Sequence, residues 1–198
     1  MRIRRRIFIP MVTLTIVCCF AVLFATILLF NRELDSAVQD KVEVALNVVT
    51  HELDEMLAKS LLAALAMSSN QDLADALLAN DHENAARTAL ALQIISGLDY
   101  CIIVDTNGIV IARTNDPGNT GDNISHLPHV KSALSGNAEA HIIQGPTIRL
   151  GTSAGAPVYN EHGEIIGAVT LGFMLNKQDF AYRLRDLTGC EISLFSDN

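Results

Sequence analysis

The chain has 198 residues, 49% of them hydrophobic, with 14 basic and 22 acidic side chains. All the acidic residues follow Phe30, against 10 of the basic ones, so the chain beyond Phe30 has a net charge of 10 − 22 = −12. Because phosphate backbones are bound by clustered positive charge, we expect no nucleic-acid partner. The four cysteines include no Cys-x-x-Cys pair, and the sequence predicts neither a metal site nor a cofactor.

An uninterrupted apolar run from Ile7 to Phe30 follows four arginines, Arg2, Arg4, Arg5 and Arg6. A helix over this run is long enough to cross a hydrocarbon layer of about 30 Å. The alternative is a cleaved signal peptide, but its apolar region is about 7 to 15 residues long, and this run ends without an Ala-x-Ala-like site. Basic residues beside a spanning segment stay in the cytoplasm. We therefore expect a cytoplasmic N-terminus (1–6), a transmembrane helix (7–30) in the inner membrane, and the rest in the periplasm or outside the cell.

Residues 31–97 are predicted to be helical. An apolar stripe with spacings of three or four runs along residues 34–67, at Val38, Val42, Ala45, Val49, Leu53 and Met56. This spacing is typical of one long amphipathic helix, here continuing from the membrane. The stripe can pack on its own domain, on a second copy of the chain, or on both, and we expect a homodimer through the N-terminal helices.

Two further helices are predicted before residue 98. Asn70 has the position of an N-cap, and the helix after it has an apolar face of Leu73, Leu77 and Leu78. Polar residues at 79–83 indicate a turn. The next helix is stopped by Gly97 and carries five apolar residues, Ala89, Leu90, Leu92, Ile94 and Ile95.

After Gly97 the sequence changes to β-branched residues and turn signals. Residues 101–105 and 109–112 flank Asn107-Gly108, a strong hairpin signal, and are followed by a polar loop at 114–123 and a short helix at 126–135. Three strands are expected at 140–144, 148–159 and 164–173, then a short helix at 179–187 and a strand beginning at 190. The predicted fold class is α+β: a transmembrane helix continuing into a long helix, followed by a PAS-like antiparallel sheet.

Two segments of this sheet carry a resemblance to a known family. Residues 102–113 and 155–172, the latter containing Ala-Pro-Val and then Gly-x-Ile-Ile-Gly-x-Val-x-x-Gly, resemble the two hairpins of extracellular Cache sensor domains. Such domains occur in bacterial methyl-accepting chemotaxis proteins and sensor histidine kinases. The resemblance covers residues 1–198, with the Cache module at 98–187, and residues 188–198 resemble the start of a second module, as in double-Cache receptors.

The resemblance implies a membrane-anchored extracytoplasmic domain that senses a small molecule for transmembrane signal transduction, as the input of a chemoreceptor or sensor kinase. It implies no enzymatic activity. Receptors of this type continue with a second spanning helix, a HAMP linker and a signalling module, so we expect the chain to be a fragment of a longer receptor.

In the related citrate and dicarboxylate sensor kinases, ligand carboxylates are bound by Arg and His at the end of the first hairpin and by an Arg shortly before Ala-Pro. Arg113 falls near the first of these sites. Ser153 falls where the second Arg would be expected, and Arg149 lies four residues upstream. The resemblance thus makes a carboxylate one candidate ligand.

Six residues are candidates for ligand binding: Arg113, Arg149, Thr147, Thr152, Ser153 and Tyr159. The planar fork of an arginine matches the two oxygens of a carboxylate. The alternative is a surface arginine paired with Asp116 or Glu139. The four hydroxyls can hydrogen-bond a small ligand in an apolar pocket, although Thr and Ser are also ordinary residues of a sheet.

Three other patterns carry alternatives. His126-x-x-His129, with His141 downstream, can form a pH-sensitive or metal site, but lacks a carboxylate or Cys at fixed spacing. Residues 151–155 match Gly-x-Ser-x-Gly, yet that motif needs a strand-to-helix elbow, and Ser153 lies in a strand-like run.

Two rival functions stay open: a membrane-tethered structural module without a ligand, and an exported hydrolase. Cys101 and Cys190 are expected to be buried free thiols, with a disulfide between them left open.

Overall fold

The computed structural model describes the backbone of residues 2–145 and 148–190, and the side chains of residues 19, 20, 22–24, 26, 39, 41–145, 148–177 and 180–190. Two compact units divide the chain, Met1–Asn47 and Val48–Asn198. The first unit is helical throughout its described backbone. Its helix, α1, runs over Arg2–Ser68 and so extends into the second unit, which confirms one long helix without a break after residue 30.

No helix among the described residues is both long and apolar enough to cross a bilayer. Most side chains of the apolar run at residues 7–30, the predicted transmembrane segment, lie outside those residues.

Two short helices follow α1 and end where the sequence predicts. Helix α2 (Gln71–Leu78) is capped by Asn70, whose side-chain oxygen accepts a hydrogen bond from the Leu73 amide at 3.0 Å. Helix α3 (His82–Ser96) is capped by Asp81 and ends at Gly97, which has a left-handed backbone with φ of 68°. Glycine reaches that conformation without the steric cost of a Cβ, so Gly97 stops α3 as expected.

A five-stranded antiparallel sheet forms the centre of the second unit, in the order β2-β1-β5-β4-β3. The hairpin around Asn107-Gly108 is confirmed, and all five predicted strands form. The strands are β1 (Tyr100–Val104), β2 (Val110–Arg113), β3 (Glu139–Ile143), β4 (Gly151–Tyr159) and β5 (Ile165–Met174). Helix α4 (Pro128–Leu134) precedes β3, and α5 (Gln178–Thr188) follows β5. The strand expected from residue 190 lies outside the described residues.

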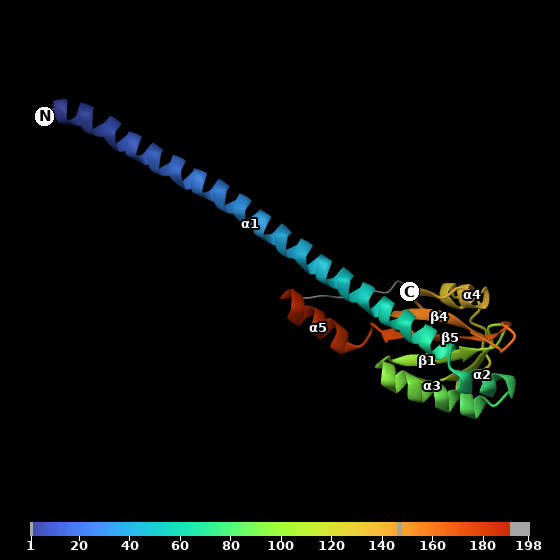
Figure 1. Ribbon diagram of the computed structural model, residues 1–198. Helices are drawn as coiled ribbons and strands as arrows, with labels where there is room; N and C mark the ends of the chain where they lie inside the picture. The colour runs from blue at the N-terminus through green and yellow to red at the C-terminus, as the bar shows by residue number, and fades with distance from the viewer. Residues whose placement is uncertain (1, 146–147, 191–198) are drawn as a thin grey trace. The chain divides into compact units, whose positions relative to one another are not determined.

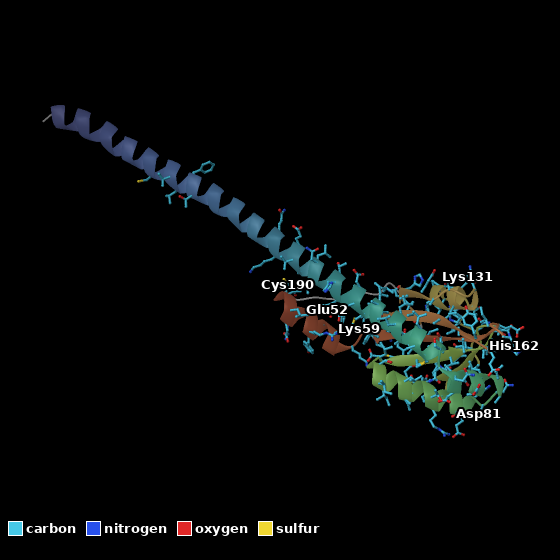
Figure 2. All side chains as sticks on the ribbon, in the orientation of Figure 1. Glu52, Lys59, Asp81, Lys131, His162 and Cys190 are labelled. Atoms are coloured by element: carbon cyan, nitrogen blue, oxygen red, sulfur yellow. The ribbon has the colours of Figure 1, made fainter. Side chains whose placement is uncertain are left out.

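The sheet is covered on both faces (Figure 1). Against one face pack the C-terminal part of α1 with α2 and α3, through a core that includes Ala64, Leu73 and Val169. Against the other packs α4, through Val130 and Ala133. Figure 2 marks the two sides by Asp81, at the start of α3, and Lys131, on α4. Because both faces are covered, β4 is buried at every position from Gly151 to Val158.

Helix α3 buries a different face from the one predicted. Its buried residues are Ala85 and Ala89, whereas Leu90, Ile94 and Ile95 are exposed by 44%, 68% and 81%. Small alanines let the helix axis lie close to the sheet, which a periodicity read from large apolar residues cannot detect. Leu78, predicted for the apolar face of α2, is also exposed.

The apolar stripe of α1 packs partly on its own domain. Met56 is buried with Leu175, Phe180 and Leu184 in a small core, against which Val49 and Leu53 also pack. Val42, further toward the N-terminus, is 59% exposed. The first of the two expected uses of the stripe is therefore realised from Val49 onward, through α5.

Candidate functional site

A cavity of about 190 Å³ lies on the α4 side of the sheet and is called the α4-side cavity here. Strands β1, β4 and β5 form its floor, and α4 with the loops before and after it forms the walls. Its apolar wall consists of Ile102, Ile124, Leu127, Ile143 and Ile148. Its polar lining consists of Tyr100, Arg113, Asp122, Asn123, His126, His129, Gln144, Ser153 and Thr170. A mostly apolar wall with a few polar groups is typical of small-molecule sites.

Arg113, the last residue of β2, is 3% exposed and lines this cavity. Its Nη2 donates to Asp122 Oδ2 at 2.6 Å, and its Nη1 donates to the Asn119 carbonyl at 2.9 Å. Its Nε is buried and has no partner among the described residues. The alternative that paired this arginine with Asp116 or Glu139 is wrong, since the carboxylate is that of Asp122.

His129, on α4, is 1% exposed and reaches the cavity because α4 lies unusually close to β4. A Cβ placed on Gly155 would collide with the His129 carbonyl, so only glycine permits this approach. Burial, with a smaller contribution from His141, lowers the pKa of His129 from 6.5 to about 4. The imidazole is therefore neutral near pH 7. Its Nδ1 finds no hydrogen-bond partner in the described part of the chain.

Ser153 in β4 and Thr170 in β5 carry two buried hydroxyls toward the same cavity. Neither oxygen has a partner within the described ranges. Tyr100, beside them on β1, instead donates its hydroxyl to the Thr152 carbonyl at 3.0 Å. Burial raises the pKa of the Tyr100 phenol, against an opposing effect of the nearby Ser153 hydroxyl, so the phenol stays protonated.

Of the six predicted ligand residues, the structure brings Arg113 and Ser153 together at the α4-side cavity. Thr152 lies on the opposite face, where its hydroxyl is 3.4 Å from that of Ser60 on α1. Tyr159 is 43% exposed and donates to the Gly136 carbonyl, beside a separate surface groove. Arg149 is exposed and does not line the cavity, and Thr147 lies outside the described residues.

Four lining residues were not predicted as ligand residues: Tyr100, Asp122, His129 and Thr170. The only sequence signal for Thr170 is a polar residue within the otherwise apolar run 165–171. His126 and His129 both line the cavity, but no three His, Cys, Asp or Glu side chains of the described residues gather as a metal site requires.

The remaining chemical alternatives have clear positions. Ser153 stands inside β4, away from any strand-to-helix elbow of the kind a Gly-x-Ser-x-Gly nucleophile needs. Cys101 and Cys190 are free thiols. The Cys101 thiol is buried 3.3 Å from the Met67 sulfur, and burial raises its pKa, whereas Cys190 is only partly buried.

Comparison with known proteins relates this architecture to bacterial sensors. The sensor histidine kinase DpiB of Escherichia coli (strain K12) is 26% identical over 117 residues, which are 59% of this chain and 20% of that protein. The chain thus spans about a fifth of the length of this curated relative.

Solved structures share the fold. The sensor domain of the Vibrio cholerae histidine kinase DctB matches 71% of this chain and 57% of that one, with a TM-score of 0.63 and 19% identity. The ligand-binding domain of the Campylobacter jejuni chemoreceptor Tlp3, in complex with 4-methylisoleucine, matches 75% of this chain and 59% of that one, with a TM-score of 0.51 and 12% identity.

The family described as the double sensory domain of two-component sensor kinases matches residues 35–198, most of the chain. The sheet order, the helix cover and these relatives agree with that match. The chain belongs to this family of double-Cache sensory domains.

Proposed function

We propose that the chain is the extracytoplasmic ligand-sensing part of a membrane receptor and that its ligand binds in the α4-side cavity. One observation carries this proposal. Four buried polar atoms without a partner among the described residues belong to residues lining this one cavity: Arg113 Nε, His129 Nδ1, Ser153 Oγ and Thr170 Oγ1. An unpaired buried polar group costs about 1–3 kcal/mol. A bound molecule that pairs these groups offsets that cost, and an assembly module without a ligand gives no reason for it.

The size and lining of the cavity limit the ligand. A volume of about 190 Å³ is somewhat larger than the roughly 150 Å³ that holds a benzene molecule. The ligand is therefore small, with an apolar body against Ile102 and Ile143 and a polar end toward Arg113. A carboxylate suits the Nε donor of Arg113 and the hydroxyls of Ser153 and Thr170. The Tlp3 domain, which has the same fold, is in complex with 4-methylisoleucine, a small molecule of this kind.

Adjacent residues of β4 connect the cavity to α1. Ser153 lines the cavity, and Thr152 beside it contacts Ser60 of α1 on the other face of the sheet. A ligand that shifts β4 therefore acts on α1, which is continuous over Arg2–Ser68. Signalling follows only if the ligand binds two arrangements of this contact with different affinity.

Membrane attachment forms part of the proposal and rests on the sequence. Residues 7–30 are an uninterrupted apolar run of transmembrane length, with residues 1–6 in the cytoplasm and the sensory domain outside. We expect the full chain to stay in the membrane pellet after alkaline carbonate extraction. Its release into the supernatant would contradict the anchor.

A thermal-shift screen of small metabolites against the full chain in detergent tests the ligand site. Thr170→Val removes a cavity hydroxyl while keeping the side-chain shape, and Thr152→Val makes the same change on the opposite face. We expect at least one compound to raise the melting temperature, with an affinity at least fivefold weaker for Thr170→Val and unchanged for Thr152→Val. A screen without hits, or hits insensitive to Thr170→Val, would contradict the proposal.

A further inference from the structure

The charges around the α4-side cavity cancel. Arg113 is the buried cation, and Asp122 is the carboxylate paired with it at 2.6 Å. His129 is neutral near pH 7 because burial lowers its pKa to about 4. The remaining titratable groups of the lining are the exposed His126 and the buried Tyr100 phenol, which stays protonated. Among the described residues, no other Lys, Arg, Asp or Glu lines the cavity.

The backbone fixes Asp122 in this role. The Val110 amide of β2 donates to the Asp122 carbonyl at 2.9 Å, and the Gly121 amide donates to the Val110 carbonyl at 2.9 Å. The same segment supplies the Asn119 carbonyl that accepts from Arg113 Nη1. The loop is thus paired along β2, and the carboxylate is placed on Arg113 by hydrogen bonds on both sides of it.

This pair restricts what Arg113 offers to a ligand. Both Nη atoms are engaged, and the Nε donor is the group that lacks a partner in the described ranges. An anion entering the cavity would bring a second negative charge next to a cation that is already compensated. A buried charge without its own counter-charge is strongly unfavourable. A zwitterion avoids this penalty, since its carboxylate accepts from Nε and its ammonium lies toward the Asp122 carboxylate.

We propose that Asp122 is a specificity-determining residue of this cavity: by compensating Arg113 it makes the cavity select a small zwitterion over an anion of the same shape. The inference rests on the proposed function, because it concerns the ligand of the same cavity. It predicts that the identity of residue 122, through its charge, sets the charge of the ligand.

Calorimetric titration of the full chain in detergent at pH 7 tests this selection with two probes, L-valine and 3-methylbutanoate, which share a branched apolar body and differ in the ammonium. We expect the wild-type chain to bind L-valine at least tenfold more tightly than 3-methylbutanoate. Asp122→Asn should reverse the preference by at least tenfold, while Asp122→Glu should keep it. Asp116→Asn, in the same loop but away from the cavity lining, is the matched control and should behave as the wild type.

Three results would overturn the inference: a wild-type preference for 3-methylbutanoate, no binding of either probe, or an unchanged preference in Asp122→Asn. The comparison of the two probes on the wild-type chain needs no variant, so it decides even if Asp122→Asn does not fold. If the metabolite screen finds only anions that depend on Thr170, the inference fails and the proposed function stands. If the screen finds nothing, the proposed function fails.

Discussion

The hydroxyl of Thr170 is buried in β5 and has no partner within the described part of the chain, although a valine would fill the same space. Thr152, two strand positions across the β4–β5 pair, differs in this respect. Its Oγ1 accepts a hydrogen bond from the Phe173 amide at 3.3 Å and lies 3.4 Å from Ser60 Oγ. The same residue type is thus satisfied on the α1 face and unsatisfied at the cavity.

Replacing each threonine by valine should change stability in opposite directions. Removing an unpaired buried hydroxyl relieves a desolvation cost, so Thr170→Val should raise the free energy of unfolding by about 1 kcal/mol. Thr152→Val removes a made hydrogen bond and should lower it by about 1 kcal/mol. Thermal unfolding of the ligand-free full chain, followed by circular dichroism, measures both. A loss of stability in both variants would mean that Thr170 is already satisfied in the fold.

His129 makes stability depend on pH. Its pKa falls from 6.5 in the unfolded chain to about 4 in the folded one, so below pH 6.5 the unfolded chain binds more protons. The contribution is complete above pH 6.5 and is lost as the pH falls toward 4. Between pH 7 and pH 5 we expect a loss of about 2 kcal/mol.

The variant His129→Gln should remove most of this dependence, because glutamine does not titrate. His126→Gln, at an exposed position three residues earlier, is the control and should keep the wild-type slope. Unfolding curves at pH 7, 6 and 5 give the comparison. Parallel pH dependence in the wild type and His129→Gln would show that other groups produce it.

At the scale of elements, the contact between α4 and β4 shapes the α4-side cavity. Gly155 of β4 lies under the His129 carbonyl, and a methyl group there would overlap the helix backbone. Gly155→Ala should therefore push α4 away, lower the free energy of unfolding by about 2 kcal/mol and weaken ligand binding. Gly118→Ala, in the open loop with nothing within 4 Å of the added carbon, should be neutral. Chemical unfolding of both variants tests this, and equal stabilities would contradict the close contact.

The limits of sequence reasoning are also clearest in these elements. Strand positions, turns and caps follow from local signals, such as Asn70 before α2 and Gly97 after α3, and these were predicted correctly. The sequence did not reveal that Ser153 faces the cavity and Thr152 faces α1. Strand β4 is buried on both faces, so no polar alternation marks its phase. Likewise, the Asp122–Arg113 pair depends on the loop folding back along β2, which is a tertiary contact.

At the scale of the whole molecule, the second unit provides a sheet with two different faces. One face joins α1, α2 and α3 through a close-packed core, and the other holds a cavity with unpaired polar groups. This division suits a sensor, because β4 contributes Ser153 to the cavity and Thr152 to the contact with α1. The sequence predicted this α+β architecture and the sensory family, because its hairpins carry local patterns. It did not predict which face holds the cavity.

Hydrogen exchange of the full chain in detergent, with and without the compound that stabilises it most in the metabolite screen, tests the α4-side cavity most directly. We expect the ligand to slow exchange in β1, α4 and the start of β4, whose residues line the cavity, and to leave α3 unchanged. Slowed exchange confined to α2, α3 or the groove beside Tyr159, with the cavity segments unchanged, would contradict the account.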